Sequence, residues 1–251
     1  KSYFINRFGQ LSDAYLFYQM QDIAWEHAGV LGFGYEQLRE KQQFWVLARL
    51  LVKIERHPGW GEEFALETWS RGTDGFFGYR DYNFIDKAGK SIIQGTSSWL
   101  VLDLKSKRIV RISGFGDFPK YDENILGTDA QKVKSPRTGN KLKFAPTRFN
   151  EIDINQHFNT GRYIERITDS YDCEFHKNNE LAEFEINFLK EGMPDDSLAI
   201  KKQEKDKNNH LCSVVREADG KDLVRARLVW RNRFHNPSDD LESSDEYPTY
   251  P

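Results

Sequence analysis

The sequence has few cysteines and no long apolar run, and each shortage excludes a class of protein. Two cysteines, Cys173 and Cys212, are too few for a disulfide framework and lack metal-ligand spacing. We therefore expect free, buried thiols in a reducing cytoplasm. No apolar stretch approaches the roughly 18 residues of a membrane helix, and no charged and then apolar leader opens the chain. The sequence thus predicts neither a membrane partner nor a secretory segment.

An excess of charge of one sign is also missing. The chain has 36 basic and 39 acidic residues, a net charge of -3 and a pI near 6.1, so its composition does not indicate nucleic-acid binding. The six histidines show no supporting ligand spacing, so we expect no metal and no cofactor. At 251 residues the chain can bury a substantial core as one large or two small domains.

Aromatic residues are abundant, at 14% with six tryptophans, which suits a deep apolar core or tunnel. Helical and period-two apolar patterns alternate along the chain. They predict helices over 13–28 and 159–174, with Gly29 ending the first. They also predict strands, which we list in chain order: 2–9, 46–54, 64–70, 76–85, 91–104, 144–152, 181–189, 198–204, 210–217 and 222–230.

The order strand, helix and four strands occurs twice, which predicts two α+β units, each an antiparallel sheet wrapped around a central helix. Arg7-Phe8 before the first helix echoes Arg148-Phe149 before the second. On that register Asp153, Asn155 and His157 fall opposite residues Ser12, Ala14 and Leu16. We expect an N-terminal domain over 1–112, a linker over 113–143, a C-terminal domain over 144–235 and an acidic tail over 236–251.

One stretch combines polar side chains with a helix start. Asp153, Asn155 and His157 alternate along the chain just before the predicted helix, which Asn159 or Thr160 can cap. A helix start offers free N–H groups and a positive dipole end, which suit chemistry that develops an oxyanion. Taken alone, however, Asp-x-Asn-x-His is more typical of a solvated turn, and a metal site is the other alternative.

Three stretches together resemble a known family, the acyl-acyl carrier protein (acyl-ACP) thioesterases of the double hot-dog type, which include plant chain-terminating enzymes and bacterial relatives. The first is Trp-Val-Leu-Ala-Arg at 45–49 with His-Pro-Gly-Trp-Gly at 57–61. The second runs from Trp99 to Arg111 and has the basic end Lys-Ser-Lys-Arg. The third is Asp-Ile-Asn-Gln-His-Phe-Asn at 153–159, which resembles the family's catalytic signature.

The resemblance implies two tandem hot-dog units that hydrolyse the thioester of fatty acyl-ACP, releasing free fatty acid and ending chain elongation in fatty acid biosynthesis. It implies catalytic roles for Asp153, Asn155 and His157, and for an acidic residue about 35 positions downstream. That place is Glu-Cys-Gly in the plant enzymes and Lys-Glu-Gly here, so the role falls to Glu191, whose alternative is a solvated loop end. The acyl chain is expected in the N-terminal domain, reached from between the units.

The chemistry leaves the division of labour open. Glu191 with Asn155 can hold and deprotonate water, His157 can orient the thioester or protonate the leaving thiolate, and Asp153 can fix the imidazole or share the base role. Backbone N–H groups at the start of the predicted helix at 159–174 can receive the oxyanion. Two other classes stay open, namely another hot-dog acyl-thioester enzyme (an acyl-CoA thioesterase, hydratase or dehydratase) and a non-catalytic acyl-binding module.

The implied partner is an acyl carrier protein bearing a phosphopantetheine-linked chain. Since such carriers are acidic, a basic surface should mark the docking face. A homodimer is plausible because hot-dog units pair, although two fused units can pair within one chain. Three groups of cations are candidates for the docking face: Lys105, Lys107, Arg108 and Arg111; Lys132, Lys134, Arg137, Lys141 and Lys143; and Lys201 and Lys202.

Overall fold

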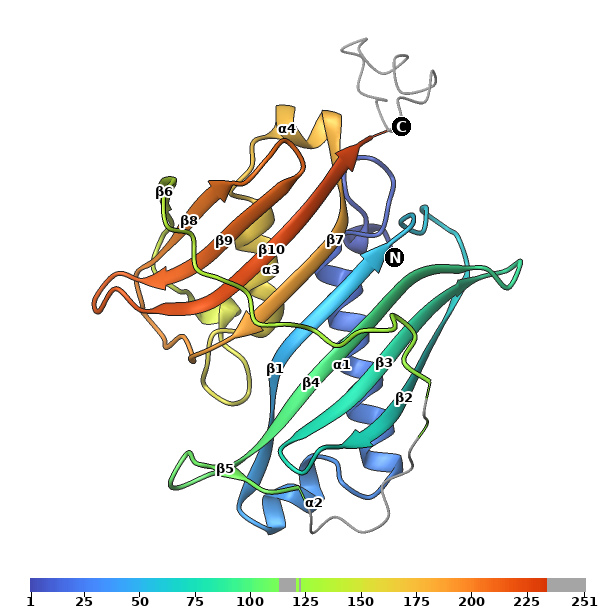
Figure 1. The fold of residues 1–251 in the computed structure, drawn as a ribbon, viewed down its shortest axis with the longest axis vertical. Coiled ribbons are helices and arrows are strands. Elements are labelled where there is room, and N and C mark those ends of the chain that lie inside the picture. Colours follow the sequence, from blue (N-terminus) through green and yellow to red (C-terminus); the bar gives the residue numbers. More distant parts are fainter. Residues whose placement is uncertain (113–120, 122, 234–251) are drawn as a thin grey trace, which may run out of the picture.

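A single ten-stranded sheet runs through the computed structural model, which describes residues 1–112, 121 and 123–233 (Figure 1). The strand order is β2-β3-β4-β1-β7-β10-β9-β8-β6, with β5 paired to β4. The strands are β1 (Gln43–Ile54), β2 (Phe64–Thr73), β3 (Phe77–Asp86), β4 (Ser91–Asp103), β5 (Ile109–Val110), β6 (Asn140–Lys143), β7 (Asn179–Phe188), β8 (Leu198–Glu204), β9 (Asn209–Arg216) and β10 (Asp222–Asn232). All pairs are antiparallel, so the predicted α+β class is confirmed.

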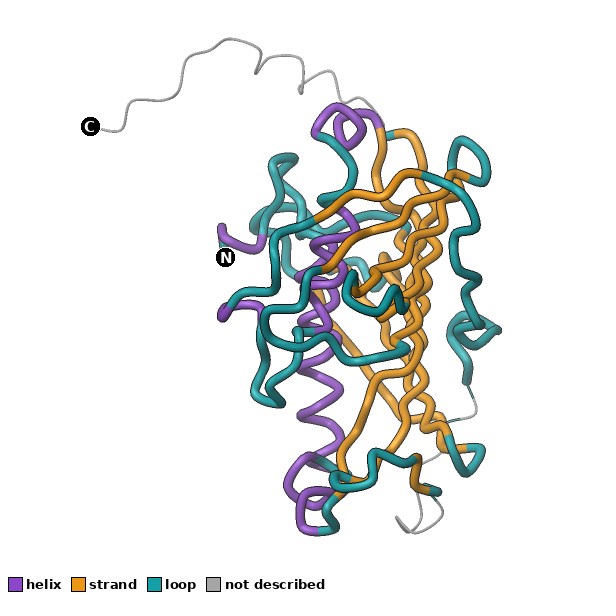
Figure 2. Tube along the Cα trace, turned by 90° about the vertical axis from the view of Figure 1, so that its left-hand side faces the viewer, coloured by secondary structure: helices purple, strands orange, loops and turns teal. Residues whose placement is uncertain are grey.

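The helices lie on one face of this sheet (Figure 2). They are α1 (Asp13–Val30), α2 (Tyr35–Glu40), α3 (Thr160–Thr168) and α4 (Cys173–Asn178), with 3₁₀ turns at Ser2–Phe4 and Phe149–Glu151. The helices α1 and α3 contact each other, and one buried cluster includes Phe17 of α1, Ile167 of α3 and Phe184 of β7. Burial of this continuous apolar surface joins the two halves of the chain. No helix in the described residues is long and apolar enough to cross a membrane.

The two units meet along β1 and β7, which pair antiparallel from Arg49 opposite Asn187 to Lys53 opposite Glu183. In each unit the first strand pairs with the last, β1 with β4 and β7 with β10, and a bulge interrupts both ladders. The order of the second unit is therefore the reverse of the first, as expected for two like units related by a pseudo-twofold axis. Each unit finds its partner within one chain, which leaves a homodimer as a separate prediction.

Several local predictions were wrong at the ends of the units. Residues 2–9 and 144–152 do not form strands, since each contains only a 3₁₀ turn followed by a tight loop. Pro146 has no N–H for a ladder, and the strand β6 forms before it, inside the predicted linker. The short helix α2 was not predicted, and α1 runs through Gly29 to Val30.

The predicted helix over 159–174 is two helices, because its middle offers competing hydrogen bonds. The Thr168 hydroxyl bonds back to the carbonyls of Ile164 and Glu165, and the Ser170 hydroxyl bonds to Ile167 O. Asp172 then starts α4 by accepting from the N–H of Phe175 at 2.7 Å.

The linker crosses the face of the sheet opposite the helices (Figure 1). The backbone N–H of Val133 donates to the Asn187 side chain at 2.7 Å, and the Asn187 amide donates back to Gln131 O at 2.9 Å. The predicted tail at 236–251 and the linker residues 113–120 and 122 lie outside the described residues. The domain boundaries stay a prediction.

Candidate active site

The predicted polar stretch forms a tight loop that closes on itself. Ile152 and Phe158 form an isolated bridge at its base, and Asp153 N donates to His157 O at 2.8 Å. One carboxylate oxygen of Asp153 accepts from the N–H groups of Asn155 at 2.8 Å and His157 at 3.3 Å. Asp153 therefore makes an Asx turn, and its side chain folds the loop that presents the other two residues.

Glu191 lies beside the imidazole of His157, although the two residues are far apart in the sequence. Its Oε2 is 3.2 Å from Nε2 of His157, whose side chain is 19% exposed while that of Glu191 is 39% exposed. The pair is thus open to water on the carboxylate side. The structure brings together His157 and Glu191 through their side chains, whereas Asp153 is hydrogen-bonded to the backbone N–H and C=O of His157.

Two contacts hold Glu191 in place. Gly192 O accepts from Phe158 N at 2.8 Å, which attaches the segment after β7 to the loop at 152–158. Arg216 donates to Glu191 O at 2.6 Å and to Asp196 at 3.0 Å. Neither Arg216 nor Asp196 was predicted, because no spacing or motif connects them to the loop and only the β8–β9 hairpin brings them there.

Backbone N–H groups at the start of α3 were predicted to receive an oxyanion, but the loop uses several of them. The Asn159 side chain caps the N–H of Gly161 at 2.9 Å, and Arg162 N donates to Asn159 O at 3.0 Å. The cap itself is the one predicted for Asn159. The Asn155 amide is then the polar donor that this loop offers to the neighbouring cavity.

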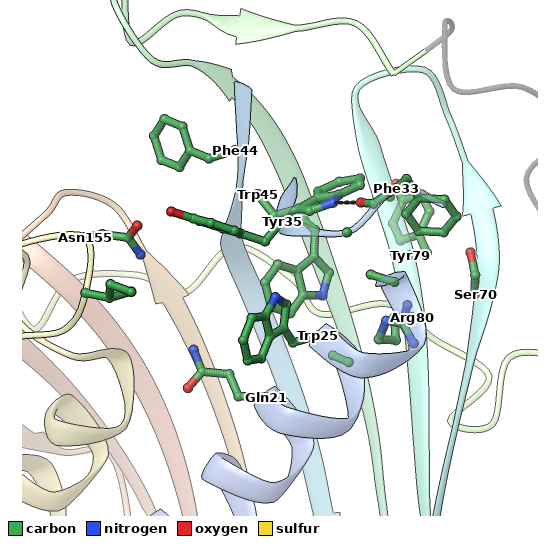
Figure 3. A pocket seen from close by; sticks show the side chains of 16 residues that line it. Gln21, Trp25, Phe33, Tyr35, Phe44, Trp45, Ser70, Tyr79, Arg80 and Asn155 are labelled. Carbon is green, nitrogen blue, oxygen red and sulfur yellow. Dashed lines mark hydrogen bonds between the residues drawn. The ribbon is translucent and has the colours of Figure 1, made fainter. Parts of the chain in front are cut away.

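An apolar cavity of about 320 Å³ extends from the loop at 152–158 into the N-terminal unit (Figure 3). Asn155 and Ile154 line one end, Phe44 and Trp45 of β1 and Trp99 of β4 line the sheet side, and Gln21, Ala24, Trp25 and Ala28 of α1 lie across from them. Ser70 of β2 and Arg80 of β3 lie at the opposite end, toward the outer edge of the sheet. The shape and lining suit an alkyl chain whose head group sits at the loop.

The far end of the cavity carries a buried cation. Arg80 is only 6% exposed, and its guanidinium donates to Thr68 at 3.0 Å and lies 2.9 Å from Nδ1 of His27. Burial lowers the pKa of Arg80, and burial together with the neighbouring Arg80 charge lowers the pKa of His27. A desolvated guanidinium is a poor neighbour for a methyl group, so Arg80 marks a polar end to the apolar cavity.

The loop at 5–11 in the first unit repeats the geometry of the loop at 152–158 in the second unit. The bridge between Ile5 and Leu11 matches that between Ile152 and Phe158. The Asn6 side chain accepts from the N–H groups of Phe8 at 2.9 Å and Gln10 at 3.1 Å, as Asp153 accepts from Asn155 and His157.

This match corrects the predicted register. Asp153, Asn155 and His157 lie opposite residues Asn6, Phe8 and Gln10, not opposite Ser12, Ala14 and Leu16. The echo of Arg-Phe pairs was misleading because those side chains do not determine how either loop closes. Leu11 N donates to Pro58 O as Phe158 N donates to Gly192 O, so Glu191 corresponds to His57. The first unit has the same loop, with Asn6, Phe8 and Gln10 in place of Asp153, Asn155 and His157 and with His57 in place of Glu191.

The sequence predicted no metal site and two buried thiols. No group of three or more His, Cys, Asp and Glu side chains in the described residues could hold a metal ion. Both cysteines are free, and Cys212 is buried as predicted. Cys173 is exposed, so the prediction of a packed thiol there was wrong, because residue 173 starts the surface helix α4 instead of continuing α3.

The fold and the site define a chain of two hot-dog units with a polar loop at the head of an apolar cavity. Comparison with known proteins identifies the particular family. The acyl-ACP thioesterase N-terminal domain matches residues 2–114 and the C-terminal domain matches residues 133–232. The chain belongs to the acyl-ACP thioesterase family, and the resemblance found in the sequence is confirmed.

Among solved structures, an acyl-ACP thioesterase from Bacteroides thetaiotaomicron superposes with a TM-score of 0.83, at 25% identity over 92% of this chain and 94% of that one. A 12:0-ACP thioesterase from Umbellularia californica superposes with a TM-score of 0.81 at 20% identity, over 93% of this chain and 95% of that one. A MaoC-like dehydratase from Phytophthora capsici reaches a TM-score of 0.52 at 12% identity, over 75% and 72%. The fold alone is thus shared with a dehydratase.

Curated relatives are longer than this chain. The chloroplastic palmitoyl-acyl carrier protein thioesterase of Gossypium hirsutum is 24% identical over an alignment of 249 residues that covers 89% of this chain and 60% of that protein. A chloroplastic acyl-acyl carrier protein hydrolase of Cuphea viscosissima is 26% identical over 204 residues, which is 74% of this chain and 48% of that protein. The chain therefore spans about half to three fifths of the length of the curated relatives it matches.

Proposed function

We propose that the protein hydrolyses the thioester of fatty acyl-ACP and releases free fatty acid. The observation that carries this proposal is the His157–Glu191 pair beside the loop from which Asn155 lines the apolar cavity. Membership of the acyl-ACP thioesterase family supports it, as do the names of the curated relatives. Release of fatty acid from the carrier ends chain elongation, so the reaction belongs to fatty acid biosynthesis.

In this proposal the acyl chain occupies the cavity and its thioester lies at Asn155. The aromatic and aliphatic lining removes the chain from water, at about 0.8 kcal/mol for each buried CH₂ group. The Asn155 amide donates to the carbonyl oxygen, which becomes an oxyanion as water adds to the carbonyl carbon.

Glu191 is the proposed general base. Its carboxylate is half-exposed, so water reaches it, whereas Oδ1 of Asp153 already accepts two backbone hydrogen bonds. Glu191 takes a proton from the attacking water, the C–S bond breaks, and the thiolate of the phosphopantetheine leaves. His157, which Glu191 orients, supplies the proton that the thiolate takes up, and the proton that Glu191 took from water then passes to His157, which restores both groups.

Asp153 is proposed as a positioning residue. Its hydrogen bonds hold the backbone of Asn155 and His157, and the uncharged Asn6 makes the same two bonds in the first unit. The loop geometry therefore does not need a charge at this position. The charge of Asp153 is free to add to the field at the imidazole but is not required to fold the loop.

The test uses purified protein and acyl-ACP of defined chain lengths. Free fatty acid and free carrier thiol in equal amounts are expected. An unsaturated or hydrated acyl chain still attached to the carrier would show a hydratase or dehydratase instead, and tight binding without turnover would show an acyl-binding module. Preference for acyl-CoA over acyl-ACP would reassign the substrate. The cytoplasmic location stays a prediction from the free cysteines.

A further inference from the structure

The three basic groups that were candidates for carrier docking differ in the contacts that their side chains make. Lys141 and Lys143 both pair with Glu217, at 3.0 and 3.4 Å. Lys202 donates to Ser170 O at 2.9 Å, and its ammonium lies 3.8 Å from the centre of the Tyr171 ring. These cations are already used within the C-terminal unit, on the strands β6 and β8 at the outer edge of the sheet.

The group that contains Lys105, Lys107 and Arg108 lies at the turn between β4 and β5. Asp103 fixes the turn, since its Oδ1 accepts from the N–H groups of Lys105 at 3.1 Å and Ser106 at 2.7 Å. These hydrogen bonds, that of Ser106 N first, lower the pKa of Asp103. The turn presents the exposed side chains of Lys105, Lys107 and Arg108. Within the part of the chain that the structure describes, none of these three side chains forms an ion pair with a carboxylate.

This turn adjoins the substrate cavity. The ammonium of Lys107 lies 4.9 Å from the centre of the Phe44 ring, and Phe44 lines the cavity together with Asn155. Phe44 and Asn155 lie toward the same side of the cavity, away from Ser70 (Figure 3). A partner bound over the turn would therefore stand next to the end of the cavity where the thioester is placed.

We propose that the β4–β5 turn, through Lys105, Lys107 and Arg108, docks the acidic surface of the carrier protein that presents the thioester. The inference rests on the proposed function, because that function supplies the acidic partner. Exposed cations beside a cleft attract an acidic partner through long-range fields and accelerate encounter, and salt weakens the effect. The hydrogen bonds of Asp103 hold the backbone of the turn, so its charges stay beside the cavity.

The test is the double variant Lys105→Glu/Arg108→Glu, which leaves Lys107 against Phe44. Its matched control is Lys132→Glu/Lys134→Glu, which changes the net charge equally on exposed residues of the linker that crosses the opposite face of the sheet. Each protein is assayed with acyl-ACP and with the same acyl chain on free pantetheine, at low and high salt, after thermal melting confirms the fold.

We expect the turn variant to raise the KM for acyl-ACP about tenfold or more at low salt and to flatten its salt dependence. Its kcat/KM for acyl-pantetheine should stay within about twofold of wild type, and the control should stay near wild type with both substrates. If the turn variant melts early, Lys105→Gln/Arg108→Gln replaces it, with an expected smaller rise in the same direction.

Two results would overturn the docking proposal: a KM for acyl-ACP equal to that of the control, or an equal loss on both substrates. Failure of the proposed function looks different, because wild-type protein would then release no fatty acid from acyl-ACP at any salt concentration. The two failures are thus distinguished by the wild-type measurement alone.

Discussion

Oε2 of Glu191 lies 3.2 Å from Nε2 of His157, while Asp153 contacts the backbone N–H of the same histidine. The side-chain partner of the imidazole is therefore the carboxylate that is distant in sequence. Glu191 and Asp153 carry the same charge but make different contacts with His157. Substitutions at the two positions should therefore have different effects.

Glu191→Gln should lower kcat by about 10² to 10⁴, with little change in KM, because the amide cannot accept a proton from water. The measurement is release of fatty acid from acyl-ACP at saturating substrate. Lys190→Gln, at the neighbouring exposed residue, is the control and should keep wild-type kcat. A Glu191→Gln enzyme with wild-type kcat would remove Glu191 from the role of base.

Asp153→Ala should lower kcat/KM much more than Asp153→Asn, because asparagine can still accept the N–H bonds of residues 155 and 157. We expect asparagine to retain activity within about tenfold of wild type and alanine to lose about a hundredfold. Asn6→Ala, the matching change in the first unit, should cost about 1 kcal/mol of stability without lowering kcat. Equal losses for Asp153→Asn and Asp153→Ala would mean that the charge itself is needed.

Arg80→Met should shift the preference toward longer acyl chains, since it replaces the polar end of the cavity with an apolar side chain. Two additional buried methylenes are worth about 1.6 kcal/mol, so kcat/KM for a chain two carbons longer should rise about tenfold. A profile over carrier-bound chains measures this. Arg225→Met, which removes an Arg–Asp222 pair in the C-terminal unit, should leave the profile unchanged. An unaltered profile in both variants would show that Arg80 does not limit the chain.

Acid should destabilise the protein through His210, which is 2% exposed and lies 2.9 Å from the Tyr171 hydroxyl. Burial is the main cause that lowers its pKa below the ordinary value. The unfolded state, with a pKa near 6.5, then binds the proton first. The free energy of unfolding should therefore fall as pH drops below about 6.5, and stop falling from this cause below the folded-state pKa.

Denaturant unfolding between pH 8 and pH 5 measures this effect. His210→Asn should flatten the curve in that range, because the titrating group is gone. A curve with the same slope as wild type would assign the acid sensitivity to other groups, such as His27, whose pKa burial also lowers.

Gly161→Ala should destabilise the fold by about 1–3 kcal/mol through overpacking. A Cβ at residue 161 of α3 would clash with the Tyr18 ring, where α3 packs against α1. Gly29→Ala in α1 meets nothing within 4 Å and should stabilise by up to about 1 kcal/mol. Thermal or denaturant unfolding of the two variants measures the change in the free energy of unfolding for each. If Gly161→Ala left the stability unchanged, Tyr18 would move aside freely.

Much of the fold follows from the sequence because its signals are local. Alternating apolar residues predicted β1 and β7, and apolar residues at helical spacing predicted α1. The wrong predictions lie where local hydrogen bonds compete with regular secondary structure. The hydroxyls of Thr168 and Ser170 broke a predicted helix, and 3₁₀ turns replaced two predicted strands.

The sequence by itself determined the family, the two-unit α+β plan and the stretch around Asp153 and His157, since these depend on periodicity and a motif of neighbouring residues. Only the tertiary structure decided that Glu191 faces His157, that Asp153 folds its own loop, and that Arg80 ends the cavity. These contacts join residues from different strands and loops. They arise from sheet pairing and helix packing, which cannot be predicted from the spacing of residues within one segment.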